Sequence, residues 1–513
     1  MNRLSLTAVA GGLVVLASCS QEELTKAPQA QEPMPIAFRA GVATRVNPDL
    51  DYTSNPATFY VTAYSNSHTA VDGVVPDALF TDEAFYMMGA NLYASTSNQK
   101  WPTTEQANQV EFFAYAPSLE EIKNAALTQL DPTASNYETL LGNYNNGVKF
   151  YNQCIPGNTL DPLNQENTTF AGVQLYRGFK LGRFYVATDI SKQVDFITAH
   201  VSAPTPSSED EAKIGVELNF KHQLSNVELR AFSGNQDYNI EIAGVRLGRP
   251  YTGGAIFNFC DAQGSANNPE GGQWGISKDP QRLPVEYIYG PGDEIYRMGS
   301  YNNLTGGQVI SSPAHTTTAT ALSIMGKGGN AMVLPTKNAA WGGEANPWIA
   351  PKYSAYSGDG TNDPYPDKNP KAWDAEKEGD MYFSILLRVT LKPKGSELTT
   401  QQIYPYGNNT NMNVVYIEKE KESNKVIGRV PSKTATAGAN NEILEFGWAA
   451  VPVGVNWERG KKYVYTLDFS GGVGIQDPED NKPGAPIIGD GIKFSVSVVD
   501  WVETNNTTPI PQE

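Results

Sequence analysis

Histidines are the first side chains to examine for acid–base or metal chemistry. The chain of 513 residues has four of them, His68, His200, His222 and His315. None lies in an HExxH motif or beside a CxxC pair, so their spacing indicates neither a zinc site nor a catalytic dyad. GxSxG, GxxxxGKS/T and GxGxxG motifs are absent as well. The sequence therefore predicts a protein that is not an enzyme and that has no metal or cofactor.

Residues 359–367 form an oxygen-rich run that resembles a calcium-binding loop in composition. The run departs from the EF-hand pattern, because its sixth position lacks glycine and its twelfth, Pro370, lacks glutamate. The acidic residues 477–480 are similar. Both runs are interpreted as solvated loops.

Three tryptophans, Trp341, Trp348 and Trp373, lie in Gly/Pro-rich sequence. Exposed aromatic rings there could stack on sugars or contact a partner. The same rings could instead cover the small core of an insertion, which is the favoured interpretation.

Cys19 is the residue for which the sequence predicts a covalent modification. Arg3 precedes an apolar run, residues 4–16, that is too short to span a bilayer and is typical of a secretory signal. Ala17 and Ser18 then lead directly into Cys19, which resembles the bacterial lipobox. We expect a signal peptide at 1–18, a lipid on Cys19 and a flexible tether over 19–33. Of the other cysteines, Cys154 and Cys260 could pair or remain as free thiols.

Composition limits the partners and the fold. The net charge of −17 disfavours nucleic acid, because phosphate binding needs a basic face. Charged residues make up only 18%, and 47 glycines and 34 prolines indicate many turns. These features favour many short strands joined by long loops.

Apolar and polar residues alternate in several segments, which is typical of half-buried antiparallel strands. The segments are 216–221, 227–230, 240–242, 245–247, 462–469 and 492–498. Apolar runs at 332–334 and 385–387 suit central strands. One helix is expected after Ser118, where Glu121 completes a capping box and Leu119, Ile122 and Ala126 share a face.

The expected organisation has two large domains. We place an N-terminal β domain at 34–265 and a C-terminal β domain with Gly/Asn/Trp-rich insertions at 266–503. A polar tail follows at 504–513.

Several pieces, spread over nearly the whole mature chain, resemble the fimbrillin family of Bacteroidota, which comprises pilin subunits of the FimA and Mfa type. In chain order they are residues 16–19, 36–40, 44–45, 59–64, 101–102, 110–117, 195–199, 220–225, 227–229, 457–467 and 498–501. The resemblance implies an all-β fold of two transthyretin-like antiparallel β-sandwich domains with long loop insertions and few helices. It also implies export through the periplasm as an outer-membrane lipoprotein and assembly with other fimbrillin subunits into surface fimbriae.

The resemblance further implies maturation by an arginine-specific protease, which cuts after the first strand. That strand then leaves, and a strand from a neighbouring subunit takes its place. In this chain the corresponding strand covers 34–43. Its apolar face carries Met34, Ile36, Phe38, Ala40 and Val42.

Two arginines could be the cleaved residue. Arg39 lies inside the expected strand, whereas Arg45 follows it in turn-like sequence before Pro48. Because loops are cut more readily than paired strands, we expect cleavage after Arg45, with Arg39 as second choice.

The C-terminus bears on the position of the subunit in a fibre. Residues 504–513 contain only Ile510 as a large apolar residue, together with two prolines, so they make a poor donor strand. A subunit with an acceptor groove and no donor could sit only at the distal end, which predicts a tip or accessory subunit with a host or bacterial surface target. The alternative function is a surface lipoprotein that binds glycans through aromatic residues such as Trp341 and Trp348.

Overall fold

Strands make up most of the regular structure, and this confirms the all-β class. The computed structural model describes residues 33–42, 56–65, 78–89, 91–103, 107–128, 130–147, 149–152, 179–259, 272–275, 281–298, 315–326, 329–336, 381–392, 401–406, 413–453, 455–477 and 486–501. No helix in these ranges is long and apolar enough to cross a membrane.

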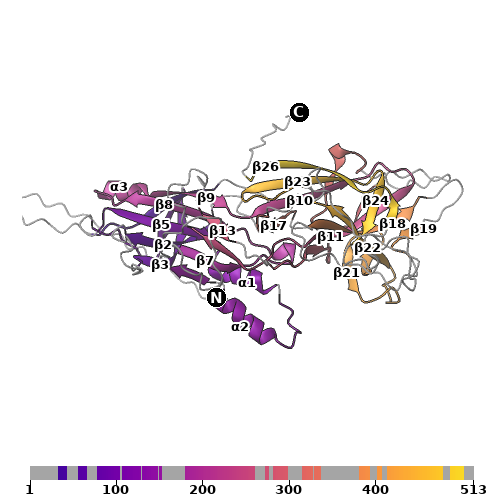
Figure 1. The fold of residues 1–513 in the computed structure, drawn as a ribbon, viewed down its shortest axis with the longest axis horizontal. Coiled ribbons are helices and arrows are strands. Elements are labelled where there is room, and N and C mark those ends of the chain that lie inside the picture. The colour runs from indigo at the N-terminus through magenta and orange to yellow at the C-terminus, as the bar shows by residue number, and fades with distance from the viewer. Residues whose placement is uncertain are drawn as a thin grey trace, which may run out of the picture.

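The first sheet lies at one end of an elongated molecule (Figure 1) and closes on itself. Its hydrogen-bonded order is β1 (Ala37–Val42), β4 (Leu92–Ser95), β3 (Phe80–Gly89), β2 (Thr58–Ser65), β5 (Gln109–Ala116), β8 (Ile197–Pro204) and β9 (Val216–His222). We call these strands the N-terminal barrel. Strand β1 pairs with both β4 and β9, so it joins these two strands and closes the sheet into a barrel.

The alternation within β5 shows how the barrel is packed. Val110, Phe112 and Ala114 lie in the core inside the barrel. Phe113 and Tyr115 face the other way and join a second, larger core that continues through the rest of the molecule. Both faces of this strand are therefore buried from Phe112 to Ala116.

Two further sheets build the other end of the molecule. The five-stranded sheet has the order β16 (Leu322–Ser323), β10 (Ser225–Phe232), β23 (Lys461–Asp468) and β26 (Lys493–Asp500), with β17 (Ala331–Val333) also paired to β10. The ten-stranded sheet has the order β14 (Val285–Ile288), β11 (Tyr238–Gly248), β18 (Tyr382–Leu391), β22 (Asn441–Pro452), β20 (Val415–Glu420) and β21 (Val426–Val430). Off this path, β15 (Tyr296–Met298) pairs with β11, β19 (Gln401–Tyr404) with β18, and β24 (Gly472–Gln476) with β22 and β25 (Pro486–Gly489).

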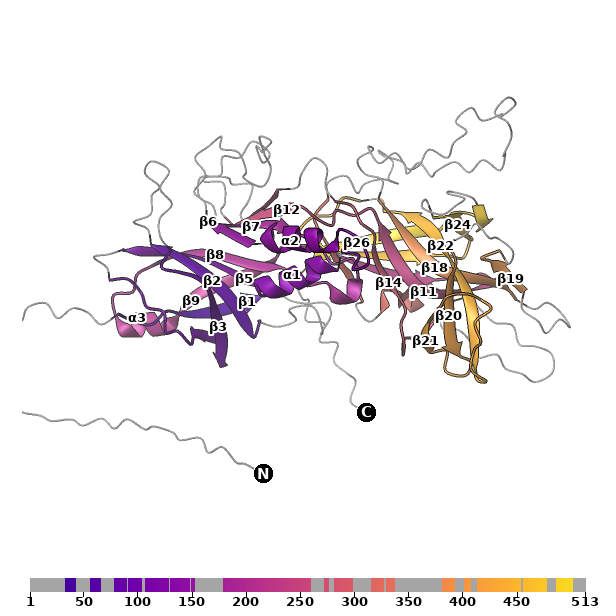
Figure 2. The same cartoon turned by 90° about the horizontal axis from the view of Figure 1, so that it is seen from below.

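A small four-stranded sheet and short helices complete the fold (Figure 2). The sheet has the order β13 (Gln273–Gly275), β12 (Ala255–Asn258), β7 (Phe179–Phe184) and β6 (Lys149–Asn152). The helices are α1 (Leu119–Leu127), α2 (Tyr137–Gly147), α3 (Glu209–Ile214) and the 3-10 turns η1 (Ile190–Lys192) and η2 (Thr318–Thr320). The predicted capping box of α1 is present, with Ser118 and Glu121 bonded reciprocally. Neither α2 nor α3 was expected from the sequence.

The predicted alternating segments lie in strands, except that Phe469 and Ile492 fall one residue outside β23 and β26. The run 385–387 lies in the central strand β18. The run 332–334 is different, because β17 is a short strand whose one partner among the described strands is β10. Along β26 the alternation weakens, since Val498 and Val499 are both about half exposed on a strand at the edge of its sheet.

Strand pairing divides the chain differently from the expected boundary at 265/266. β10 and β11 belong to the sheets of the C-terminal half, although they precede that boundary. β12 and β13 pair instead with β7. A domain division stays a proposal, and the pairing favours placing it between β9 and β10.

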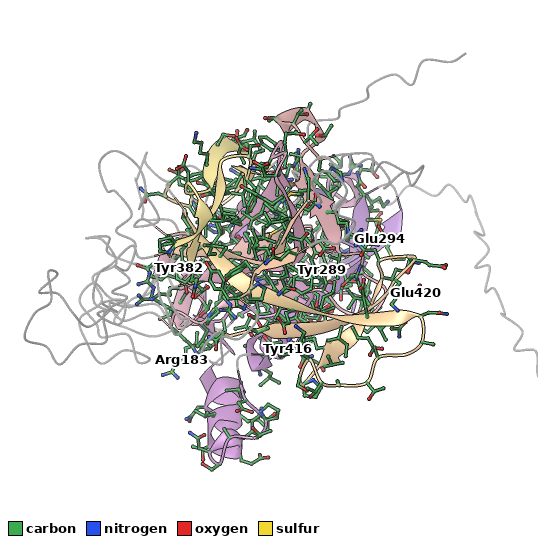
Figure 3. All side chains as sticks on the ribbon, turned by 90° about the vertical axis from the view of Figure 1, so that its right-hand side faces the viewer. Arg183, Tyr289, Glu294, Tyr382, Tyr416 and Glu420 are labelled. Atoms are coloured by element: carbon green, nitrogen blue, oxygen red, sulfur yellow. The ribbon has the colours of Figure 1, made fainter. Side chains whose placement is uncertain are left out.

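The interior between the sheets is filled by side chains, as the view along the long axis shows (Figure 3). Tyr289 lies at its centre, 1% exposed, and its hydroxyl donates to the carbonyl of Ile324 at 3.0 Å. Burial raises the pKa of the Tyr289 phenol well above its usual value, so this group is a neutral donor.

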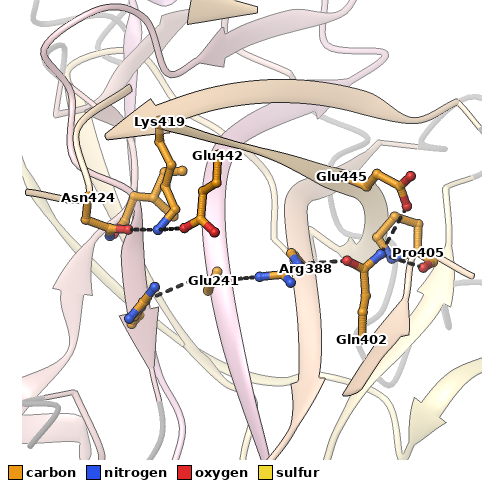
Figure 4. Close-up of polar contacts among 10 residues, drawn as sticks. Glu241, Arg388, Gln402, Pro405, Lys419, Asn424, Glu442 and Glu445 are labelled. Atoms are coloured by element: carbon orange, nitrogen blue, oxygen red, sulfur yellow. Dashed lines mark hydrogen bonds and ion pairs between the residues drawn. The ribbon is translucent and has the colours of Figure 1, made fainter. Parts of the chain in front are cut away.

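A network of charged residues around the buried side chains of Glu241 and Lys419 holds the ten-stranded sheet (Figure 4). Glu241 on β11 accepts hydrogen bonds from Arg297 (2.8 Å) and Arg388 (2.5 Å). Burial alone would raise the pKa of Glu241, but the two guanidinium groups outweigh it and hold the pKa below its usual value. Lys419, whose side chain is fully buried, pairs with Glu442 at 3.0 Å. These pairs link β11, β15, β18, β20 and β22.

Candidate functional site

The strand β1 fills a groove in the wall of the N-terminal barrel. Met34, Ile36, Phe38 and Ala40 are 7%, 2%, 0% and 4% exposed, and all four belong to the barrel core. The alternate residues face outward, with Arg39 exposed. The structure thus places these four predicted residues on one inward face. Val42 lies in β1, and its side chain is outside the described residues.

Phe38 is the centre of this packing. Its ring meets the rings of Phe85, Phe112 and Phe59 edge-on, with centroids at 4.7, 5.1 and 5.9 Å. Edge-to-face aromatic pairs of this kind add to the free energy gained by burial alone. A strand that lacked an apolar side chain at this register would leave the centre of the barrel core empty.

The backbone of β1 is bonded on both sides. It runs antiparallel to β4, with Phe38 opposite Tyr93, and parallel to β9, with Phe38 opposite Val216. Before the strand begins, the Ile36 N–H donates to the Gln99 carbonyl at 2.8 Å. Removing this one strand would expose two sheet edges at once.

The two candidate cleavage residues differ in accessibility. Arg39 is paired on both sides, with Leu92 and Glu217, so a protease must first separate the strands. Arg45 lies outside the described residues, as do Cys19, Cys154, Cys260, the oxygen-rich run 359–367 and the tail 504–513. Trp341, Trp348 and Trp373 also lie outside them. Both interpretations of those tryptophans, the favoured cover of a small core and the alternative contact with a sugar or partner, remain predictions.

An acidic group lies on strand β3 of the barrel, where β3 pairs with β2. Asp82 has a left-handed backbone (φ 52°), and its N–H donates to Thr62 Oγ1 at 3.0 Å across a register shift between β2 and β3. The Tyr115 hydroxyl donates to its carboxylate. Partial burial of this carboxylate raises the pKa of Asp82 to about 6.

A second cluster ties the barrel to the C-terminal half. His222, the last residue of β9, shares a hydrogen bond with Asp195 (Nδ1 to Oδ2, 2.7 Å), and both side chains are buried. The imidazole stacks on Trp501, which directly follows β26. The backbone N–H of Trp501 donates to the Gly460 carbonyl at 2.7 Å.

Four pieces of the family resemblance meet here, namely 195–199, 220–225, 457–467 and 498–501. Arg459 donates to Gln223 at 3.2 Å and to the Gly272 carbonyl at 2.6 Å. The sequence offered these runs as separate matches, and no local pattern indicated that they pack together. The His222–Trp501 stack and hydrogen bonds to side chains and to backbone carbonyls hold these pieces together. Their role in the fold is to join the N-terminal barrel to the C-terminal half.

No group of three or more His, Cys, Asp or Glu side chains in the described ranges could hold a metal ion. His200, another histidine considered for chemistry, bonds to Glu111 at 2.8 Å and stacks on Phe113. Both His200 and His222 are thus engaged in packing between strands.

Comparison with protein-family models and with curated proteins gives no match. Among solved structures, the chain is similar to a fimbrial protein from Bacteroides vulgatus (12% identity, 91% of this chain and 99% of that one, TM-score 0.41). It is also similar to a candidate cell adhesion protein from Parabacteroides distasonis (10% identity, 91% and 98%, TM-score 0.34). A third is the tip fimbrial protein Mfa3 from Porphyromonas gingivalis, with C-terminal truncation (10% identity, 91% and 99%, TM-score 0.25).

Proposed function

We propose that this protein is a structural and adhesive subunit of a cell-surface fimbrium, and that strand β1 is replaced on assembly by a strand of a neighbouring subunit. The observation that carries the proposal is the position of β1. It is the first strand described, it closes the barrel, and it contributes the central side chain of the core, Phe38. A single cut beyond it would free it from the rest of the chain.

The energetics of an empty groove support replacement. Met34, Ile36 and Phe38 are buried, and burial of such side chains contributes about 1.5–3 kcal/mol each. Loss of β1 would also leave β4 and β9 without backbone partners on facing edges. Strand addition to such edges is an established mode of recognition, in which the backbone supplies affinity and the pockets supply specificity.

A replacement strand must meet definite requirements. It needs about nine residues with apolar side chains at alternate positions, because the buried face begins at Met34, ahead of β1, and β1 itself ends at Val42. It needs a large side chain at the register of Phe38, where three phenylalanine rings converge. A strand running like β1 would be antiparallel to β4 and parallel to β9.

The export route forms part of the proposal. A lipid on Cys19 would hold the precursor at the outer membrane, and an arginine-specific protease cutting after Arg45 would release both the anchor and β1. A tip or accessory position is proposed because the tail 504–513 has the composition of a poor donor strand.

Paired variants in the producing cell test the proposal. Arg45→Ala should leave the subunit anchored to the membrane and absent from fibres on non-boiled gels. Arg39→Ala is the matched control and should assemble normally, because that side chain is exposed and lies within a paired strand. Normal incorporation of Arg45→Ala into fibres would contradict cleavage at this residue.

Deletion of 504–513 tests the position in the fibre. A tip subunit should assemble equally well without these residues. If the deletion blocked incorporation beneath another subunit, the tip assignment would be wrong.

A further inference from the structure

A pocket of about 540 Å³ lies where the segment before η1 crosses the edge strand β14. The Glu286 N–H donates to the Thr188 carbonyl at 2.8 Å, and Asp189 and Glu286 form a parallel bridge. Arg429 on β21 also lines the pocket. The volume lies within the roughly 300–1,000 Å³ range of small-molecule sites. No residue of β1, β4 or β9 contributes to it.

Two carboxylates in this pocket retain capacity to accept hydrogen bonds. Glu286 accepts from Arg246 through Oε2 (3.0 Å), and its Oε1 has no hydrogen-bond partner among the described residues. Asp189 accepts through Oδ1 from the N–H (2.9 Å) and hydroxyl (2.7 Å) of Ser191, and Lys192 lies 3.7 Å from Oδ2. A carboxylate can accept about four hydrogen bonds, so both can take donors from a ligand.

Arg429 supplies the complementary donors. Its side chain is exposed and forms no ion pair within the described part of the chain. A guanidinium presents five N–H donors in a fixed fork, which suits paired ligand oxygens.

The charges around the pocket select against an ionic ligand. An anion would meet the carboxylates of Asp189 and Glu286. A cation would meet Arg429, and the carboxylates already have Lys192 and Arg246 beside them. A neutral ligand with many hydroxyl groups satisfies both the acceptors and the donors, because each hydroxyl can donate and accept.

Leu283, Pro284 and Ile288 add an apolar wall to the pocket. A sugar ring has this combination of surfaces, with hydroxyls around its rim and C–H groups on its faces. We propose that this pocket binds a neutral sugar residue of a glycan, with Glu286 and Asp189 accepting its hydroxyl protons and Arg429 donating to its oxygens.

Saturation-transfer NMR and calorimetry on the full chain test this site. The probes are methyl α-D-mannoside, methyl β-D-galactoside and methyl N-acetyl-β-D-glucosaminide, with N-acetylneuraminic acid and D-glucosamine as charged comparators. At least one neutral glycoside should bind saturably and more tightly than either charged sugar. Arg429→Ala should weaken that binding about tenfold, as expected for loss of one or two hydrogen bonds.

Two controls separate the site from other effects. Lys425→Ala is the matched control. It removes an exposed cation just before β21 that does not line the pocket, so binding should be unchanged. Protein cut after Arg45 should bind the glycoside as tightly as uncut protein, because the pocket lies apart from β1 and its partner strands. The result is therefore independent of whether β1 is replaced. The proposal is wrong if no neutral glycoside binds, if a charged sugar binds more tightly, or if Arg429→Ala binds like the unmodified protein.

Discussion

The imidazole ring of His222 lies flat on the indole ring of Trp501, with centroids 4.0 Å apart and planes 9° apart. His222 ends β9, the parallel partner of β1, and Trp501 follows β26 at the edge of the five-stranded sheet. The wall of the groove is thereby fixed to the C-terminal half of the molecule. Because β9 is anchored in this way, we expect its edge to keep its position if β1 is removed.

The stack predicts a large cost for truncating Trp501. Trp501→Ala removes an indole that is 3% exposed, so we expect a loss of about 3–5 kcal/mol in the free energy of unfolding, measured in urea. Trp501→Phe should cost less, because a smaller ring can still stack. Val499→Ala is the control, since this side chain is about half exposed and should change stability by no more than about 0.5 kcal/mol. Equal losses for Trp501→Ala and Val499→Ala would contradict the account.

The groove predicts a similar contrast within β1. Phe38→Ala should destabilise the uncut protein by about 3–5 kcal/mol, because it empties the space between three phenylalanine rings. The adjacent Arg39→Ala changes an outward side chain and should have little effect. Thermal unfolding of both variants measures the difference. Matching melting temperatures would show that β1 contributes little to the barrel.

Local pattern predicted several of the strands, but not the short strands β13–β16 within Gly/Asn-rich sequence and not the partners of any strand. The alternation at 34–40 and 216–220 indicated two half-buried strands, and Ser118 with Glu121 indicated the start of α1. The parallel pairing of β1 with β9 joins residues far apart in the chain, and no spacing in the sequence encodes it. The boundary at 265/266 followed a change in composition, whereas the sheets are divided by pairing that sends β10 and β11 to the C-terminal half.

The candidate sites differ in the same way. The apolar face of β1 could be predicted because it lies within one strand. The pocket of Asp189, Glu286 and Arg429 could not, because it is made by three segments that fold together from distant positions. Asp195 and His222 lay within runs matched to the family, but their shared hydrogen bond depends on tertiary packing.

Asp82 predicts an unusual dependence of stability on pH. Its pKa rises from an ordinary 3.8 to about 6 in the folded protein, so between these values the folded state binds more protons than the unfolded state. The contribution of this group therefore favours folding below pH 4 and is lost as the pH rises through 6. Asp82→Asn should be more stable than the unmodified protein at pH 7.5, and this advantage should vanish near pH 4. Melting temperatures at the two pH values measure it, and an equal effect at both would contradict the shifted pKa.

The charge network of the ten-stranded sheet predicts a cost for neutralising Glu241. Glu241→Gln leaves Arg297 and Arg388 without their shared carboxylate, and breaking a buried pair costs about 3–5 kcal/mol. Because the pKa of Glu241 is lowered in the folded state, this stabilisation is present above its unfolded pKa and is lost as the pH falls through the folded value. Glu209→Gln, which breaks an exposed pair with Lys213, should change the urea midpoint little. Comparable losses in the two variants would show that the network does not stabilise the sheet.

Exchange of the first strand tests the central claim most directly. The folded protein is cut with an arginine-specific protease, and a fluorescent peptide of residues 33–43 is added to cut and uncut samples. The account predicts a new N-terminus at Val46 and stable uptake of the peptide by the cut protein alone, with no uptake of a peptide carrying Phe38→Asp. Equal uptake by the uncut protein, or no binding of the peptide to the cut protein, would contradict the claim that strand β1 can be replaced.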